Sequence, residues 1–543
     1  MTNRRNALKS LGLGAFLWGG AATAETRAAN PAPTWARGIE GQRKADLGNG
    51  TYLNPIMSGD HPDPSILKDG QDYYMTFSSF EAYPGLVIWH SRDLVNWTPV
   101  GPALTHYIGS VWAPELCKHN GRYFLYIPTV TTANPASKKT TWVIWADDIR
   151  GPWSDPIDLN ISAQIDPGHA VGEDGSRWLF LSMGDRVRLT EDGLRTIGAV
   201  EHIYDPWQFP PETDAEGFAP EGPKIMRHGD YFYMILAIGG TAGPVTGHMV
   251  IAARSRSING PWEHHPRNPL VNTRSKAEKW WSRGHATLIE GPAKDGAAGD
   301  WWAVYHGYEN GFWTLGRQTL LAPVSWAKDG WPDFGGGDLS QPLPKPGGGL
   351  SGPHGQALSD DFLSDKYGVQ WTFFNPSPDE GARLRRDNGI LHIKATGTTP
   401  SDSSPLQFTA GEQDYECECE IEVDDGVRAG LLMFYDSQLY AGVSFDAKRF
   451  VSYKYGLEHS HPANPFGRHL FMRMRNSENV VRFHISADGV NWQRYERTFE
   501  VSGYHHNVRG GFMALKPALI VTGAGEARFR NFRFRACEPS GTE

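Results

Sequence analysis

The sequence lacks the features from which membrane, disulfide-stapled and nucleic-acid-binding proteins are built. Only four of its 543 residues are cysteine, and their spacing fits no zinc motif. After the first thirty residues, no uncharged apolar run reaches the roughly 18 residues of a membrane span. The net charge is −9, and no long run of lysine or arginine occurs, which excludes nucleic acid as an expected partner.

The cysteines are Cys117, Cys417, Cys419 and Cys537. They suggest no disulfide framework. Cys417 and Cys419 are two residues apart in an alternating stretch, so on a strand both side chains point to one face. We therefore expect buried free thiols.

Stretches with helical periodicity are also scarce, whereas turn formers and aromatic residues are abundant. The chain has 62 glycines, 38 prolines and 20 tryptophans, as many tryptophans as tyrosines. This composition predicts an all-β protein, of a kind that stacks flat ligands such as sugars on aromatic rings.

Residues 1–29 have the three parts of an export signal in the expected order. Arg4 and Arg5 form a twin arginine, an apolar stretch runs over residues 11–18, and Ala22-Thr23-Ala24 is a small-residue cleavage site. The alternative is an N-terminal amphipathic helix. The order of the parts favours a signal of the twin-arginine type, and hence a periplasmic or secreted protein.

Five short aromatic strands recur along the next part of the chain, and the first four follow one another at intervals of about 50 residues. Four of the five follow a turn signal such as Asp-Gly or Asn-Gly. A repeat of this length, with a few strands in each unit, predicts a five-bladed β-propeller over residues 45–340. A sandwich with long hairpins is the alternative, but it does not explain a tryptophan-closed turn that three repeats share. The aromatic strands are expected at residues 73–77, 123–127, 178–181, 231–235 and 301–305.

A segment rich in glycine and proline, residues 335–353, ends the repeats and predicts a linker or a wrapping segment. Alternating strands then resume at residues 390–395, 416–423, 430–435 and 482–486. They predict a second domain over residues 350–540, a concanavalin-like β-sandwich.

Three acidic residues occupy corresponding places in different repeats. Asp63, Asp166 and Glu221 each lie beside prolines, ten to twelve residues ahead of an aromatic strand. A single Asp-Pro pair is ordinary turn chemistry. Three acidic residues at corresponding positions of the repeats predict instead that all three carboxyls meet at one end of the propeller channel. Two carboxyls that flank one bond are the arrangement for glycoside hydrolysis.

Around these residues the sequence resembles glycoside hydrolase family 43, of the β-xylosidase and α-L-arabinofuranosidase type with a C-terminal β-sandwich. The resemblance rests on five motifs in the expected order: His61-Pro62-Asp63-Pro64-Ser65, Trp112-Ala113-Pro114-Glu115, Asp166-Pro167, Glu221-Gly222-Pro223 and Leu315-Gly316-Arg317.

The resemblance implies that Asp63 is the general base and Glu221 the general acid. Asp166 is then the third acid, which tunes the pKa of Glu221 and positions it. Family members invert the anomeric centre, so we expect the carboxyls of the base and the acid to stand roughly 6.5–9.5 Å apart.

Other residues match the family's binding pocket. By resemblance Arg317 reaches the sugar, Phe80 and Trp112 form stacking walls, and His285 lies at the channel centre. Their alternatives are a surface salt bridge, blade packing and a structural hydrogen-bond donor. Thr241 and His248 are weaker candidates.

No metal-ligand cluster stands out in the sequence, and the predicted reaction requires no cofactor. The resemblance allows one exception, because family members sometimes carry a calcium ion in the channel.

The leading interpretation is an inverting, exo-acting β-xylosidase that releases xylose from β-1,4-xylo-oligosaccharides. The first alternative is an α-L-arabinofuranosidase, or a bifunctional enzyme, that acts on arabinoxylan side chains. An endo-acting arabinanase fits less well, because such enzymes usually lack the sandwich. A non-catalytic carbohydrate-binding protein is the alternative class, and the third buried acid argues against it.

The sandwich has two interpretations, a separate binding module or a wall that closes the propeller pocket. An exo-acting enzyme needs a blind pocket and the linker is short, so we expect the wall. Residues 459–462 and 465–467 are the candidate loops that would bring an aromatic or histidine side chain to the rim.

Overall fold

The structure is a computed structural model that describes residues 33–293, 298–335, 337–348 and 351–538. The predicted export signal, residues 1–29, lies outside the described residues. The described residues from Thr34 onward form one compact unit. Within that unit nearly all regular structure is β-strand, and α1 (His506–Arg509) is a single short turn of helix.

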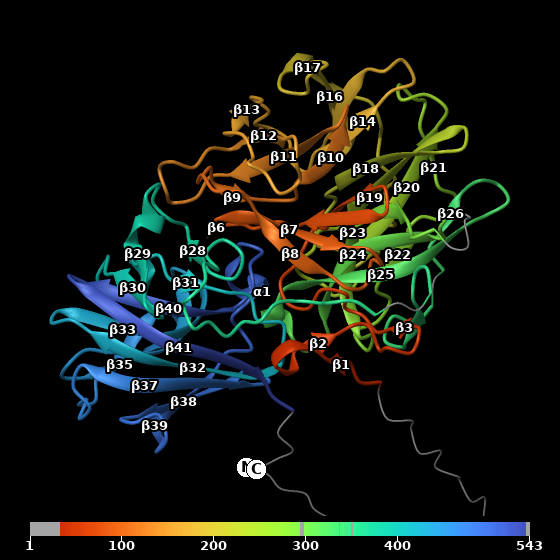
Figure 1. Cartoon of the computed structure of the whole chain (residues 1–543). Coiled ribbons are helices and arrows are strands. Elements are labelled where there is room, and N and C mark those ends of the chain that lie inside the picture. Colours follow the sequence, from red (N-terminus) through yellow and green to blue (C-terminus); the bar gives the residue numbers. More distant parts are fainter. Residues whose placement is uncertain (1–32, 294–297, 336, 349–350, 539–543) are drawn as a thin grey trace, which may run out of the picture. The chain divides into compact units, whose positions relative to one another are not determined.

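The predicted repeats each fold as one antiparallel sheet, and these sheets are the blades of the propeller (Figure 1). Blade 1 consists of β4 (Ser65–Asp69), β5 (Asp72–Thr76), β7 (Gly85–Ser91) and β8 (Thr98–Leu104). Blade 2 consists of β10 (Glu115–His119), β11 (Arg122–Val130), β12 (Thr140–Ala146) and β13 (Ile157–Asp158), with β9 (Ser110–Val111) beside β11. Blade 3 consists of β14 (Gly168–Val171), β15 (Arg177–Phe180), β16 (Asp185–Leu189) and β17 (Thr196–His202).

The last two blades follow the same plan. Blade 4 consists of β18 (Glu221–His228), β19 (Tyr231–Ile238), β20 (Met249–Ser255) and β21 (Glu263–His264), with β22 (Val271–Asn272) beside β20. Blade 5 consists of β23 (Trp280–Glu290), β24 (Trp301–Glu309), β25 (Arg317–Trp326) and β26 (Pro332–Asp333). The predicted aromatic strands are the second main strand of each blade: β5, β11, β15, β19 and β24.

Apolar side chains pack between neighbouring blades and close the propeller into a ring. Each pair of consecutive blades shares one buried cluster. The closing cluster joins blade 5 to blade 1, where Trp302 and Leu321 lie with Met75 and Trp89. Because both faces of every blade are buried in this way, its strands carry long apolar runs instead of a strict alternation.

The segments before and after the blades pair with each other. β3 (Thr51–Tyr52) is antiparallel to β27 (Leu343–Pro344), which lies in the predicted wrapping segment. Lys345 follows β27 and donates to the carboxylate of Asp46 at 2.8 Å. The glycine- and proline-rich segment therefore wraps back onto the start of the propeller. The other short elements here are β1 (Ala36–Arg37), β2 (Arg43–Lys44) and the 3-10 turns Ile39–Gly41, Ser182–Gly184 and Trp313–Leu315.

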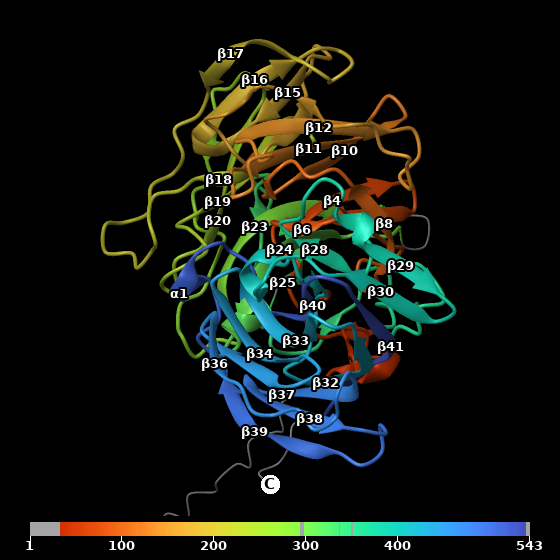
Figure 2. The ribbon, with the colours of Figure 1, turned by 90° about the vertical axis from the view of Figure 1, so that its left-hand side faces the viewer.

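The C-terminal part is a β-sandwich of two antiparallel sheets that enclose one apolar core (Figure 2). The first sheet contains β28 (Thr372–Phe374), β31 (Leu406–Gln407), β33 (Val427–Asp436), β34 (Leu439–Phe445), β35 (Phe450–Lys454), β36 (Leu457–Ser460) and β40 (Lys516–Gly523). The second contains β29 (Leu384–Asp387), β30 (Ile390–Lys394), β32 (Asp414–Val423), β37 (His469–Ser477), β38 (Val480–Ser486), β39 (Gln493–Glu500) and β41 (Glu526–Ala536). Two 3-10 turns, Glu380–Arg383 and Pro400–Asp402, connect strands.

The sandwich is joined to the propeller by backbone and by charge. β6 (Ala82–Tyr83) belongs to the blade 1 segment, yet it pairs with β28 and extends the first sandwich sheet. Glu309 of blade 5 is fully buried, 2.8 Å from the guanidinium of Arg43 and 2.6 Å from the ammonium of Lys279. Gln413 of the sandwich donates to the same carboxylate at 2.7 Å. The expected docking of the sandwich on the propeller is therefore confirmed within this unit.

The expectation of free thiols is confirmed for all four cysteines. Cys117, Cys417 and Cys419 are buried, and Cys417 and Cys419 both face the sandwich core. Cys537 is only half-buried, because it follows the end of the last strand. Among the described residues, no helix combines the length and the apolar character that crossing a bilayer requires.

Candidate active site

All seven predicted site residues line one pocket of about 40 Å³, to which every blade contributes. Blade 1 and the loops next to it supply Asp63 and Phe80, and the other blades supply the rest. The complete lining is Asp63, Phe80, Trp112, Ala113, Asp166, Glu221, Thr241, His285, Arg317 and Phe512.

Four of these residues have backbone angles that side chains other than glycine rarely adopt. The φ angles of Asp63, Phe80, Asp166 and His285 are +54°, +49°, +55° and +58°. Residues with positive φ cost free energy unless the surroundings hold them in place, and they gather at functional sites. The prolines beside Asp63 and Asp166 restrict the backbone further, so these carboxyls are aimed by the chain itself.

Gly222 shows how closely the site is packed. A Cβ atom at this position would lie 2.7 Å from ring atoms of His285, and the φ of Gly222 is +60°. Only glycine allows the strand that carries Glu221 to approach His285 so closely. The glycine after the acid is thus explained by a contact across two blades.

Asp63 is held as an ionised carboxylate. Arg317 lies 2.8 Å from Oδ1, the hydroxyl of Ser78 donates to Oδ2 at 2.5 Å, and the ring of His306 lies 3.2 Å from Oδ1. Burial opposes ionisation, but Arg317, His306 and His285 outweigh it and hold the pKa of Asp63 well below its usual range. Asp63 can therefore accept a proton near neutral pH.

Glu221 is in the opposite condition. Burial raises the pKa of Glu221 well above its usual range, and the neighbouring carboxyls of Asp166 and Asp63 raise it further. Burial likewise raises the pKa of Asp166, with a smaller contribution from Asp63, while Lys224 and Arg317 act against the rise. Carboxyls this close resist joint ionisation, so the pair retains a proton near neutral pH.

Three neutral histidines fill the channel behind Asp63. Burial lowers the pKa of His306 to about 4 and that of His285 to about 3. The Nδ1 atom of His306 lies 3.1 Å from the peptide nitrogen of Asp63 as well as near its carboxylate, and the other ring nitrogen lies 3.4 Å from the hydroxyl of Thr241. His248 stacks on His306 with 5.2 Å between ring centroids and is fully buried. Of the two weaker candidates, Thr241 lines the pocket and His248 lies behind it.

The aromatic residues of the pocket are supported by the sandwich. Phe80 belongs to the buried core of the sandwich, and Trp112 packs against that core. Both therefore line the pocket and pack at the same time. Phe512 follows α1 and lies 5.3 Å from Trp112, edge to face, with the guanidinium of Arg317 5.8 Å from its ring.

The prediction of which sandwich loops reach the rim of the pocket was wrong. The structure brings Phe512 to the pocket, and neither residues 459–462 nor residues 465–467 line it. His505 stacks on Trp313 and Asn507 accepts from the peptide N–H of Gly243, so the segment around α1 spans blades 4 and 5. In sequence this segment has only a glycine pair before Phe512, which gives no indication of its place.

The contacts of Asp63 with Ser78 and His306 were not predicted from the sequence either. Ser78 follows the first aromatic strand, and His306 lies within β24, where a histidine interrupts a buried apolar run. A buried histidine in a core strand was the one available signal for His306.

The expectation that no metal-ligand cluster exists needs correction. One ligand atom each of Asp166, Glu221 and His285 lies within 4.8 Å of the others, so this group could hold an ion. The three residues lie far apart in sequence and meet only through the repeat. The group does not fit calcium well, because Ca²⁺ takes six to eight oxygen ligands and the trio offers two carboxylates and one imidazole.

The sequence profile of Glycosyl hydrolases family 43 matches residues 52–332, which is more than half of the chain. The chain belongs to glycoside hydrolase family 43. Residues 359–535 match the Beta xylosidase C-terminal Concanavalin A-like domain, so the second domain is a concanavalin-like sandwich. The chemistry expected from the three carboxyls is therefore that of a glycosidase.

Relatives in the family are named as arabinofuranosidases or as xylosidases. A non-reducing end α-L-arabinofuranosidase of Bacteroides ovatus is 32% identical over 68% of this chain and 69% of its own. A xylan 1,3-β-xylosidase of a Vibrio species is 31% identical over 63% of this chain and 69% of its own. The crystal structure of a xylan β-1,4-xylosidase from Bacillus halodurans, 26% identical, covers 89% of this chain and 99% of its own with a TM-score of 0.76.

Proposed function

We propose that this family 43 glycosidase is an inverting, exo-acting β-xylosidase that removes terminal xylose from β-1,4-xylo-oligosaccharides. One observation carries the proposal: a single pocket holds an ionised carboxylate, Asp63, and a carboxyl that keeps its proton, Glu221. These are the two states that general base and general acid require at the same pH.

In this mechanism Asp63 takes a proton from a water molecule as the water oxygen attacks the anomeric carbon. Glu221 gives its proton to the glycosidic oxygen as the bond from that oxygen to the anomeric carbon breaks. Because the water arrives opposite the leaving group, the configuration inverts. Asp166 keeps the pKa of Glu221 high, and Arg317 keeps Asp63 ionised and oriented.

The make-up of the pocket supports exo action. Its lining comes from all five blades and, through Phe512, from the sandwich. A wall from a second domain narrows the room for the continuation of a chain, which favours a terminal sugar. A terminal sugar is the substrate unit that such a pocket accepts.

The choice between xylose and arabinose is tested by paired substrates. The kcat/KM for 4-nitrophenyl β-D-xylopyranoside is expected to exceed that for 4-nitrophenyl α-L-arabinofuranoside. The reverse order would favour the second candidate, an α-L-arabinofuranosidase, for which the name of the Bacteroides ovatus relative speaks. Activity on neither substrate, with binding of xylo-oligosaccharide intact, would support a carbohydrate-binding protein.

The stereochemistry is tested by proton NMR of the first product. Hydrolysis of a β-xyloside should release α-xylose before mutarotation, because a single displacement inverts the centre. If β-xylose came first, the roles given to Asp63 and Glu221 would be wrong.

We also propose that the chain is exported through its twin-arginine signal, with Arg4 and Arg5 as the recognised pair. Replacing both arginines by lysine should leave the protein in the cytoplasm of a bacterial host, where the unchanged chain reaches the periplasm. Equal distribution of the two in cell fractions would contradict export by this route.

A further inference from the structure

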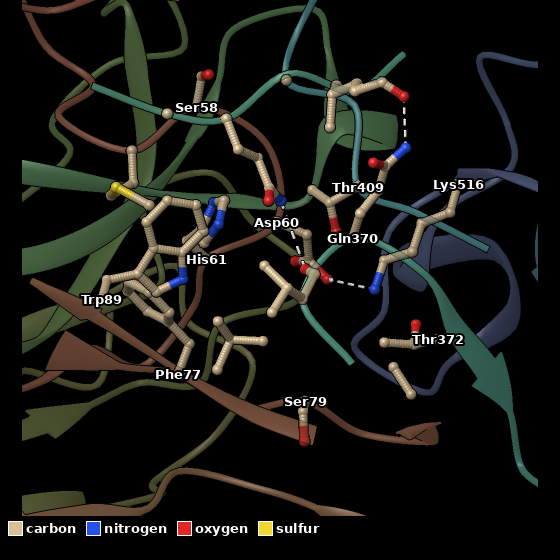
Figure 3. A pocket seen from close by; sticks show the side chains of 18 of the residues that line it. Ser58, Asp60, His61, Phe77, Ser79, Trp89, Gln370, Thr372, Thr409 and Lys516 are labelled. Atoms are coloured by element: carbon tan, nitrogen blue, oxygen red, sulfur yellow. Dashed lines mark hydrogen bonds and ion pairs between the residues drawn. The ribbon is translucent and has the colours of Figure 1, made fainter. Parts of the chain in front are cut away.

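A second cavity, of about 150 Å³, lies where blade 1 meets the sandwich (Figure 3). No residue of the active-site pocket lines it, although His61 and Asp63 are only two positions apart. Its wall combines the turn before Asp63, the start of blade 1, the segment after blade 5 and the sandwich. The lining includes Asp60, His61, Phe77, Ser79, Trp89, Gln370 and Lys516.

The cavity has an aromatic side and a polar side. Phe77 and Trp89 lie on one side in Figure 3, next to His61, with ring centroids 4.9 Å and 5.6 Å from that of His61. Gln370 and Lys516 of the sandwich lie on the other side. Pockets at domain junctions with apolar walls and a few polar groups are typical small-molecule sites.

Four polar atoms in this wall make no hydrogen bond of ordinary geometry to the described part of the chain. They are Oδ1 of Asp60, Nδ1 of His61, Oγ of Ser79 and Oε1 of Gln370. The side chain of Asp60 is 3% exposed and Gln370 is 4% exposed, so bulk water does not readily satisfy them. Gln370 directs its amide N–H groups toward the carbonyl of Leu358, which leaves its oxygen without a donor.

Such gaps are uncommon, since buried polar atoms nearly always have a partner. The oxygen of Gln370 can only accept, and the hydroxyl of Ser79 can accept as well. The partner that completes this wall is therefore rich in hydroxyl donors.

The charges in the wall balance. Lys516 lies 3.8 Å from Asp60, and Arg43 is paired with Glu309. Burial lowers the pKa of His61 and of His354 to about 4, so both rings are neutral near neutral pH. A ligand with a net charge would gain no partner of opposite sign here, which favours a neutral one.

Size and access fit a molecule larger than water. The volume is about ten times the roughly 10–15 Å³ that one ordered water needs on this measure. The turn at residues 38–42 forms one wall, and Ile39 in that turn is 44% exposed. The cavity therefore lies next to the protein surface at this turn.

We propose that the junction cavity is a second binding site, separate from the active site, for one neutral polyol of the size of a pentose. Hydroxyl groups of the ligand donate to Ser79 and Gln370, and its C–H face lies against Trp89 and Phe77. The site does not depend on the proposed activity, because the residues proposed to bind the polyol do not contact Asp63 or Glu221.

Calorimetric titration and saturation-transfer NMR of the full chain with D-xylose test the proposal, with xylitol as a second probe. We expect two D-xylose molecules per chain. Gln370→Met keeps the volume but removes the unpartnered oxygen, and it should weaken the junction event by about tenfold or more while turnover stays unchanged. Thr372→Phe should fill the cavity and abolish that event, and Thr372→Val is the matched control.

The outcomes separate this site from the active site. If Glu221→Gln lost only the binding event at the active site, the junction site would still be supported, even if the proposed function failed. Two undiminished events in Gln370→Met, with an unchanged melting temperature, would overturn the proposal. A crystal grown in saturating D-xylose that holds only ordered water in the cavity would overturn it as well.

Discussion

The propeller and the sandwich place their charged residues in opposite ways. Around the propeller channel, Asp63, Asp166, His285 and Arg317 are all nearly or fully buried. In the sandwich, β32 alternates core residues with glutamates, and the glutamates face outward. Arginines of β37 and β41 stand directly opposite them, at positions 473, 475, 528, 530, 533 and 535.

The difference separates chemistry from scaffolding. Burying a charge costs free energy that only close partners offset, and it also shifts pKa values by the amounts that acid–base catalysis needs. Charges at a half-exposed sheet face are screened and perturb little. Function is therefore expected to depend on the channel, and the sandwich to tolerate changes to its outer face.

The sharpest test of the comparison is to neutralise one carboxyl of each kind. Asp63→Asn and Glu221→Gln should each lower kcat on xylobiose by about 10²–10⁴-fold, because each removes a proton transfer. With a 2,4-dinitrophenyl xyloside, which needs no protonation to leave, Glu221→Gln should regain most of its rate and Asp63→Asn should not.

Circular dichroism should show that both variants remain folded. Glu418→Gln on the outer face of the sandwich is the matched control and should keep full activity. If Asp63→Asn responded to the leaving group as Glu221→Gln does, the assignment of base and acid would be reversed.

Phe512 is an exception to the division between a catalytic propeller and a supporting sandwich, because it comes from the sandwich and lines the propeller pocket. Phe512→Ala should lower kcat/KM on xylobiose by between about 10- and 200-fold, the range typical of lost apolar contacts in a pocket. It should also raise the activity on long xylan chains relative to xylobiose. The exposed Val508, in α1 of the same segment, provides the control Val508→Ala; an equal effect of both substitutions would argue against a pocket wall.

The pH profile tests how the buried carboxyls act on each other. Activity needs Glu221 protonated, so kcat/KM falls as the pH rises through the pKa of Glu221. Asp166 helps to raise that pKa, so Asp166→Asn should move the alkaline limb to lower pH. Asp147→Asn, at a carboxylate that is 77% exposed, should leave the limb in place. An alkaline limb that stays in place or moves to higher pH in Asp166→Asn would contradict the coupling.

The sequence predicts those parts of the fold and of the site that recur in each repeat, and it does not predict the parts that occur once. The blades, their aromatic strands and the meeting of Asp63, Asp166 and Glu221 follow from residues that recur in phase. Phe512 and Ser78 do not recur, and their places depend on tertiary packing that no local pattern encodes. The metal-like grouping with His285 escaped for the same reason, because its members come from three blades.

The outer face of the sandwich should give the smallest effect. Arg473 donates to Glu418 at 2.7 Å, and the two side chains are 27% and 21% exposed. Half-exposed pairs of this kind contribute little, so Glu418→Gln should lower the free energy of unfolding by at most about 1 kcal/mol, and less at high salt. Glu309→Gln breaks a fully buried pair and should cost about 3–5 kcal/mol. Urea unfolding of both variants measures the contrast, and similar losses would mean that the ladder of ion pairs stabilises the sandwich as its core does.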